Sequence, residues 1–223
     1  MPTGVPRPDQ AKPSALAGDL GHVSHPAPRE PTEVSGEGKT DMAATTLQGK
    51  RIAFLATDGV EEVEYVQPRE AVEKAGATAE LVSLKPGSIQ AFNHLDQGKT
   101  YDVAVTAADA DADRYDALVL PGGVANPDFL RTDPDAVRFV KAFFTAGKPV
   151  GVICHGPWTL VEAGVVAGRR ITSWPSLRTD LTNAGATWVD EQVVTDGNLV
   201  SSRKPDDLPA FCAAIVDRFA AGD

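Results

Sequence analysis

The chain has 223 residues, of which 42% are hydrophobic and 23% charged, with a formal net charge of −10. This composition indicates one globular domain, and an acidic chain without a Lys/Arg cluster argues against nucleic acid as a partner. No stretch approaches the roughly 20 apolar residues that span a bilayer, so we expect no membrane segment. Two cysteines, Cys154 and Cys212, predict a cytoplasmic protein without a disulfide framework.

The composition changes near residue 50. Residues 1–49 contain no aromatic residue and hold seven of the seventeen prolines. Such a segment cannot bury enough apolar surface to offset the entropy of ordering it. We therefore predict a disordered tail over 1–49 and a folded domain over 50–223. Met42 precedes the first predicted strand by nine residues and is a hypothetical natural start.

Strand and helix signals alternate from Arg51 onward. Pro68 is expected to kink or restart the first helix, and Val137, Val140 and Phe144 to share the buried face of the second. In chain order the sequence predicts a strand at 52–56, a helix at 61–75, a strand at 79–84, a weak hairpin within 89–106, strands at 117–120 and 150–153 separated by a helix at 134–146, a helix at 158–163, short strands near 170–173, 192–195 and 198–202, and a helix at 206–220.

This alternation predicts an α/β fold with a largely parallel sheet and helices on both faces. The run Val150–Ile153 ends abruptly at Cys154-His155-Gly156-Pro157. It predicts a buried strand that delivers Cys154 to a tight turn before a helix, at the sheet edge where open parallel sheets bind their ligands. We expect the Cys154 thiol there to be unusually acidic and reactive.

The histidines limit the chemistry. No histidine follows His155, so a hydrolase or amidotransferase triad with a later histidine is excluded. The imidazole partner of Cys154 is therefore His155 or, less favoured, His94. Cys212 lies in an apolar helical segment and is expected to be a core residue.

Two other turns fall at the same sheet edge. Of the three glutamates in Thr57–Glu64, Glu61 lies nearest the turn and is the one expected to lean over Cys154, whereas Glu62 and Glu64 suit a helix start. A carboxyl beside a thiolate tends to be protonated and can donate a hydrogen bond to sulfur. Gly122 and Gly123 end another strand, either as a simple turn or with backbone N–H groups free to hold an oxyanion. No metal-ligand cluster or dinucleotide-binding loop is found, so we expect no cofactor and no metal.

Taken together, these motifs resemble the PfpI family of intracellular proteases and protein deglycases, within the class I glutamine amidotransferase-like superfamily. The resemblance covers about residues 50–220. The matching runs are Phe54-Leu55, Asp58–Glu64, Asp116–Gly123, Gly147–Val150, Ile153–Pro157, Thr172–Leu177, Asn183–Ala186 and Ser201–Leu208.

The resemblance implies a flavodoxin-like three-layer sandwich with Cys154 as the nucleophile on an elbow and His155 as the adjacent base. It implies Glu61 as the carboxyl bonded to the thiol, and an acidic residue from a neighbouring subunit that orients the histidine. Asp128 falls nearest that place, although the family glutamate is replaced and the segment differs by one residue in length. The protein is then a homo-oligomer, a dimer or a hexameric ring of dimers.

Three functions follow as alternatives. The first is a cysteine hydrolase of the deglycase type, acting in stress protection on methylglyoxal, glyoxal or their protein adducts, with the N–H groups of Gly122, Gly123 and His155 around the oxyanion. The second is a peptidase that cleaves small peptides. The third is a stress protein in which Cys154 is a redox sensor without turnover.

Overall fold

The computed structural model describes residues 46–221. The predicted tail, except for its last four residues, and Met42 lie outside these residues. The helices are α1 (Glu62–Lys74), α2 (Ala125–Thr132), α3 (Pro134–Thr145), α4 (Pro157–Glu162), α5 (Arg178–Asn183) and α6 (Leu208–Ala221), with 3₁₀ turns at Ala112–Arg114, Pro175–Leu177 and Pro205–Asp207. The strands are β1 (Arg51–Leu55), β2 (Val60–Glu61), β3 (Thr78–Ser83), β4 (Ser88–Asn93), β5 (Asp96–Asp102), β6 (Val105–Thr106), β7 (Ala117–Leu120), β8 (Val150–Ile153), β9 (Arg170–Ile171), β10 (Thr187–Trp188), β11 (Val193–Asp196) and β12 (Leu199–Ser202).

A seven-stranded sheet forms the centre of the domain, in the order β11-β12-β8-β7-β1-β3-β6. Every neighbouring pair is parallel except β11 with β12. Strands β7 and β8 are buried along their whole length, which explains why both read as continuous apolar runs. The predicted α/β class with a largely parallel sheet is confirmed.

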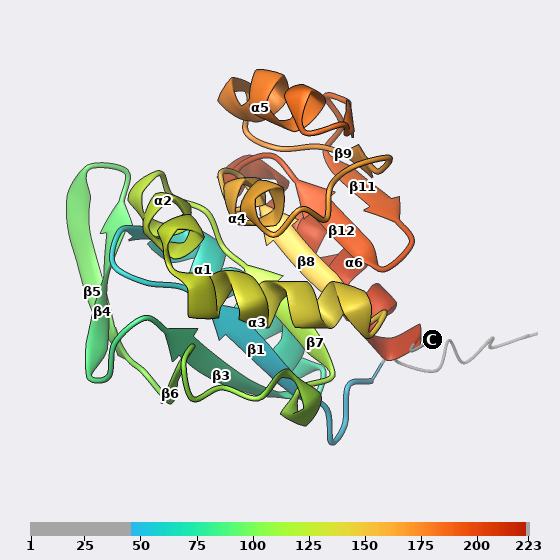
Figure 1. The fold of residues 1–223 in the computed structure, drawn as a ribbon. Helices are drawn as coiled ribbons and strands as arrows, with labels where there is room; N and C mark the ends of the chain where they lie inside the picture. The colour runs from blue at the N-terminus through green and yellow to red at the C-terminus, as the bar shows by residue number, and fades with distance from the viewer. Residues whose placement is uncertain (1–45, 222–223) are drawn as a thin grey trace, which may run out of the picture. The chain divides into compact units, whose positions relative to one another are not determined.

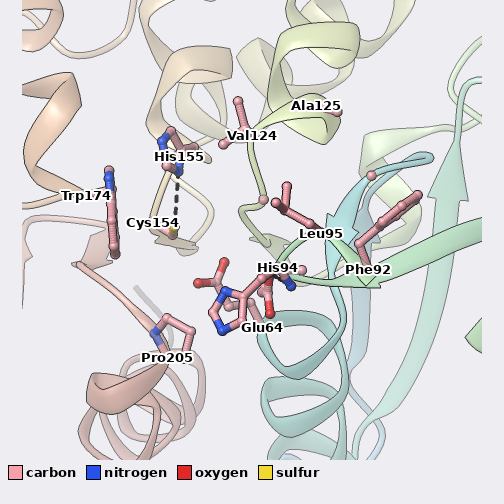
Figure 2. Close-up of a pocket in the computed structure, with 13 residues that line it drawn as sticks. Glu64, Phe92, His94, Leu95, Val124, Ala125, Cys154, His155, Trp174 and Pro205 are labelled. Carbon is pink, nitrogen blue, oxygen red and sulfur yellow. Dashed lines mark hydrogen bonds between the residues drawn. The ribbon is translucent and has the colours of Figure 1, made fainter. Parts of the chain in front are cut away.

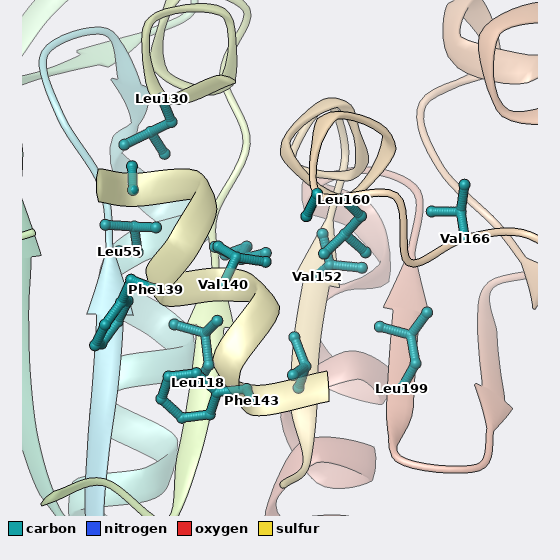
Figure 3. Close-up of a cluster of buried hydrophobic side chains, with 14 of the residues drawn as sticks. Leu55, Leu118, Leu130, Phe139, Val140, Phe143, Val152, Leu160, Val166 and Leu199 are labelled. Atoms are coloured by element: carbon teal, nitrogen blue, oxygen red, sulfur yellow. The ribbon is translucent and has the colours of Figure 1, made fainter. Parts of the chain in front are cut away.

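Helices cover both faces of this sheet (Figure 1). In β1, Ala53 and Leu55 face the core beneath α3 and α4, whereas Ile52 and Phe54 face the core beneath α1 and α6. Figure 3 shows the first of these cores, where side chains of α3 and α4 pack on the strands. The two cores make the sheet the rigid middle layer of a three-layer sandwich.

A smaller sheet in the order β2-β4-β5 flanks the domain, with β4 and β5 as an antiparallel hairpin, as predicted for 89–106. Glu62 fixes this hairpin to α1: its carboxylate accepts the Tyr101 hydroxyl at 2.7 Å, the Asn93 side-chain amide at 2.7 Å and the Lys99 backbone N–H. These contacts position the hairpin turn beside the carboxyl edge of the main sheet.

Several local expectations were wrong. Helices α2 and α5 were not predicted. The Asn126-Pro127-Asp128 run of α2 resembles a turn, although proline is tolerated in the first turn of a helix. Helix α1 continues through Pro68 without restarting.

The buried face of α3 is also rotated from the predicted one. It carries Ala136, Phe139, Val140 and Phe143, because Phe139 and Phe143 stack edge-to-face at 5.2 Å over the sheet. Across residues 46–221, no helix combines the length and apolarity that crossing a membrane requires.

Candidate active site

A pocket of about 500 Å³ lies at the carboxyl edge of the main sheet (Figure 2). Its walls come from the turns after β1, β7 and β8, from the β4–β5 hairpin, and from the segments that precede α5 and α6. The lining residues are Gly59, Glu61, Glu64, Phe92, His94, Leu95, Gly123, Val124, Ala125, Cys154, His155, Trp174 and Pro205.

Cys154 stands on the predicted elbow between β8 and α4. Its φ of 61° lies in the left-handed region, which is costly for a residue other than glycine. The turn closes through the Gly156 N–H to the Ile153 carbonyl at 2.9 Å. A Cβ at Gly156 would lie 2.8 Å from the Leu120 carbonyl oxygen, so the turn requires glycine. These contacts hold the turn in its strained conformation, and the turn presents the Cys154 sulfur to the pocket.

His155 is the imidazole partner of the thiol. Its Nδ1 lies 3.2 Å from Cys154 Sγ (dashed in Figure 2), whereas its Nε2 lies 3.4 Å from Ser176 Oγ. The ring packs between Trp158 and Trp174, with centroids 5.3 and 5.8 Å away. Burial lowers the pKa of His155 to about 4, so the imidazole is neutral at pH 7 and free to accept a proton. Both tryptophans and Ser176 were not predicted from the sequence as site residues.

The carboxyl beside the thiol is Glu64, and the prediction of Glu61 was wrong. Helix α1 begins one residue after Glu61, so Glu64 falls in its first turn on the buried face. Glu64 is fully buried, interacts with the Cys154 thiol and accepts the Gly122 N–H at Oε2, at 2.9 Å. Glu61 Oε2 instead accepts the His94 backbone N–H at 3.1 Å, in the hairpin turn. The signal that pointed to Glu64 was its spacing of four and eight residues from Pro68 and Val72, which lie on the same buried helix face.

Burial also shapes the charge of the Cys154–Glu64 pair. It raises the pKa of Glu64 from 4.5 to about 8, so the carboxyl is mostly protonated at pH 7. Burial, followed by the interaction with Glu64, raises the pKa of Cys154 as well, although N–H groups of Gly123 and His155 oppose this. The expectation of an unusually acidic thiol is therefore wrong for the free pocket. The resting pair is a neutral thiol beside a neutral carboxylic acid.

Backbone N–H groups of Gly123 and His155 face the Cys154 sulfur, and their action on an oxyanion stays a prediction. The Gly122 N–H is committed to Glu64 and does not join them, which corrects that part of the prediction. Gly122 is nevertheless required for space, because a Cβ there would lie 2.5 Å from Glu64 Oε2 and 2.6 Å from Cys154 Cβ.

Asn126 holds the turns around this site together and was not predicted from the sequence. Its side chain is fully buried at the start of α2. The amide Nδ2 donates to the carbonyls of Pro121 and Gly122, both at 3.0 Å, and Oδ1 accepts the Thr57 N–H at 2.8 Å. One side chain thus ties the β7 turn to the β1 turn.

His94 and Asp128 have different positions. His94 lines the pocket from the hairpin turn, with φ of 58°, and its ring is not the one bonded to Cys154. Asp128 is exposed on α2, and its side chain makes no hydrogen bond or ion pair with any residue in 46–221. It lies outside the pocket lining, so its predicted action on a neighbouring copy stays a prediction.

The fold and this thiol–imidazole–carboxyl arrangement define a cysteine-centred α/β protein with Cys154 on a strand-to-helix elbow. A family model, DJ-1/PfpI family, matches residues 50–218, and the chain belongs to this family.

Relatives and solved structures agree with this assignment. A Pyrococcus abyssi protein named as a deglycase is 43% identical over 166 residues, which cover 74% of this chain and 97% of the relative. YraA of Bacillus subtilis, provisionally named a cysteine protease, is 43% identical over 162 residues, covering 73% and 94%. An Anabaena variabilis crystal structure with DJ-1/ThiJ/PfpI-like and ferritin-like domains has a TM-score of 0.72 at 34% identity, covering 76% of this chain and 48% of that one.

Proposed function

We propose that the protein is a cysteine-dependent hydrolase of the deglycase type, acting on methylglyoxal, glyoxal or the adducts that they leave on proteins. The observation that carries this proposal is Cys154 Sγ on a strained elbow, 3.2 Å from His155 Nδ1 and faced by two backbone N–H groups. The pocket of about 500 Å³ suits a small carbonyl compound or one modified side chain. The name of the Pyrococcus abyssi relative gives independent support.

The resting protonation states dictate the first step. His155 Nδ1 takes the thiol proton while Sγ forms a bond to the aldehyde carbon, and the π electrons of the carbonyl move to its oxygen. The N–H groups of Gly123 and His155 stabilise this oxyanion, which then accepts the proton from the imidazolium. Removal of the thiol proton during attack makes a low thiol pKa unnecessary.

The remaining steps need no external oxidant or reductant. For methylglyoxal, a proton moves from the former aldehyde carbon to the adjacent carbon and the hydroxyl proton moves to the former ketone oxygen, so that one carbon is oxidised and its neighbour reduced. The product is a thioester of a 2-hydroxy acid on Cys154. Water hydrolyses this thioester, which releases the acid and restores the thiol.

Loss of methylglyoxal in the presence of the full chain tests the proposal, with Cys154→Ala as the matched control. Turnover by the natural chain and none by the variant is the expected result. Equal rates in both proteins would refute Cys154 as the nucleophile.

A peptidase function is the second candidate, and the name of YraA favours it. Short fluorogenic peptides assayed in parallel separate the two. Cleavage that depends on Cys154, with no consumption of methylglyoxal, would replace the deglycase proposal. A thiol that is reversibly oxidised, with neither substrate consumed, would instead favour the redox sensor.

We further propose that the active form is a homo-oligomer in which Asp128 of one copy acts on His155 of the next. The exposed apolar side chains of Val124 and Phe129, 58% and 50% accessible, lie on either side of Asp128 in and before α2 and suit a subunit contact.

Mixing two inactive variants tests this arrangement. In a dimer, Cys154→Ala and Asp128→Ala chains that exchange subunits should recover about a quarter of the natural activity, because half of the assemblies then hold one intact site. No recovery after confirmed exchange would place Asp128 outside the site.

A further inference from the structure

We propose that Ser176 is a positioning residue for His155, which holds Nε2 so that Nδ1 stays free to accept the Cys154 proton. This inference rests on the proposed function of the Cys154–His155 pair. The geometry that carries it is a chain of three groups: Sγ to Nδ1 at 3.2 Å and Nε2 to Ser176 Oγ at 3.4 Å.

The two ring nitrogens of a neutral imidazole have different roles, since one carries the proton and the other accepts. In the proposed mechanism Nδ1 accepts the Cys154 proton across the 3.2 Å contact, so Nδ1 is the unprotonated nitrogen of the resting ring. Nε2 then carries the hydrogen and needs an acceptor of its own. Ser176 Oγ is the oxygen in reach, and its lone pairs can take this N–H.

The contact between His155 Nε2 and Ser176 Oγ becomes stronger when the thiol attacks the substrate. When Nδ1 takes the thiol proton, the ring becomes an imidazolium with two N–H donors. One points back at the sulfur and the other at Ser176 Oγ, and a hydrogen bond from a charged donor is stronger than that from the neutral ring. Ser176 therefore stabilises the base in the state that drives bond formation.

Within one chain, Ser176 Oγ is the hydrogen-bond partner of Nε2 among the residues in 46–221. Asp128 of the neighbouring copy, which we propose to act on His155, would then reach the ring through this hydroxyl, since a serine can accept one hydrogen bond and donate another. Trp174 stacks on the ring at an interplanar angle of 25° and Trp158 is tilted against it at 60°, and an indole side chain offers no hydrogen-bond acceptor. Of the charged groups around the imidazole, Arg131 lies over the Trp158 ring at 5.9 Å and Asp180 accepts the Trp158 indole N–H at 2.8 Å, whereas Glu61 and Glu64 line the same pocket as His155.

The turn that carries Ser176 is itself fixed to the nucleophile. The Trp174 backbone N–H donates to the Cys154 carbonyl at 2.9 Å, and the Leu177 N–H closes the following 3₁₀ turn on the Trp174 carbonyl. The hydroxyl and the thiol are therefore placed by one hydrogen-bonded unit, which explains how an exposed serine can hold a defined position.

Ser176→Ala tests the proposal, with Ser176→Thr as the conservative variant that keeps the hydroxyl. Thr179→Ala, an exposed hydroxyl on the adjoining α5, is the matched control. Loss of one hydrogen bond predicts a roughly three- to tenfold fall in kcat/KM for Ser176→Ala. Ser176→Thr should recover most of it, and Thr179→Ala should match the natural chain.

Two readouts separate positioning from a merely structural effect. In ¹⁵N-labelled protein the His155 Nε2–H resonance, assigned by its loss in His155→Gln, should be present in the natural chain and Ser176→Thr and absent in Ser176→Ala. The acid limb of the pH profile of Cys154 alkylation by iodoacetamide should move down by roughly half a pH unit in Ser176→Ala, because the imidazolium has lost an acceptor.

An unchanged kcat/KM with a retained Nε2–H signal in Ser176→Ala would overturn the proposal. A fall in kcat/KM without movement of the acid limb, or without rescue by threonine, would overturn it too, because those results describe a structural serine. If the natural chain consumes no carbonyl substrate, the proposed function fails on its own, while the resonance and the alkylation profile still decide the role of Ser176.

Discussion

Replacing Glu64 by glutamine should remove a pH dependence from the stability of the protein. The carboxyl is fully buried beside Cys154, and burial raises its pKa from 4.5 in the unfolded chain to about 8 in the folded one. Because the folded pKa is the higher one, folding favours the protonated form. This contribution is fully present below pH 4.5 and is lost as the pH rises toward 8.

The size of the effect follows from the two pKa values. Over most of the interval the unfolded chain has released a proton that the folded chain keeps, so the free energy of unfolding falls by about 1.4 kcal/mol per pH unit. The slope flattens as the folded pKa is approached. Between pH 6.5 and 8 the expected loss is about 1.5 kcal/mol. His155, whose pKa is 6.5 in the unfolded chain and about 4 in the folded one, adds a small opposite contribution at the lower end of this window. That contribution is the same in both proteins and cancels when the natural chain is compared with Glu64→Gln.

Urea unfolding of the natural chain and Glu64→Gln at pH 6.5, 7.2 and 8 measures this difference. Glutamine can accept the Gly122 N–H and donate toward sulfur as the acid does, but it does not ionise. The free energy of unfolding of Glu64→Gln should therefore rise relative to that of the natural chain by about 1.5 kcal/mol between pH 6.5 and 8. A constant difference between the two proteins at all three pH values would refute a raised pKa at Glu64.

Three further predictions concern Gly122, Asn126 and the pH dependence of activity. Gly122→Ala should lower turnover by roughly tenfold or more, because its Cβ has no space beside Cys154. Gly164→Ala is the control, since φ there is +70° but the space is open, and it should lower the free energy of unfolding by only about 1 kcal/mol and keep activity. Steady-state rates and urea midpoints check both. Asn126→Ala should lower the free energy of unfolding by about 2–4 kcal/mol, since it leaves buried partners unpaired; a loss below about 0.5 kcal/mol in urea titration would contradict its linking role. The kcat/KM profile should fall below about pH 4 as His155 gains a proton and above about pH 8 as Glu64 loses one, and Glu64→Gln should abolish only the alkaline limb.

Much of the fold could be predicted because its signals are local. The buried strands β1, β7 and β8 are short apolar runs followed by turn signals, and each was found within one residue of its bounds. Helix α2 was missed because its first turn contains Asn126 and Pro127, which favour turns when read alone. The buried stripe of α3 was misplaced because aromatic packing on the sheet, which is a tertiary contact, set its rotation.

By itself, the sequence located the chemical centre: a strand that breaks at Cys154-His155-Gly156-Pro157 predicts a thiol at a sheet edge with His155 as its favoured imidazole partner, while His94 stayed an alternative. Tertiary structure decided what surrounds them. It placed Glu64 in contact with the thiol in place of Glu61, because the start of α1 sets which carboxyl faces inward. It also made the thiol neutral, because pKa values depend on burial that arises only when distant segments pack together.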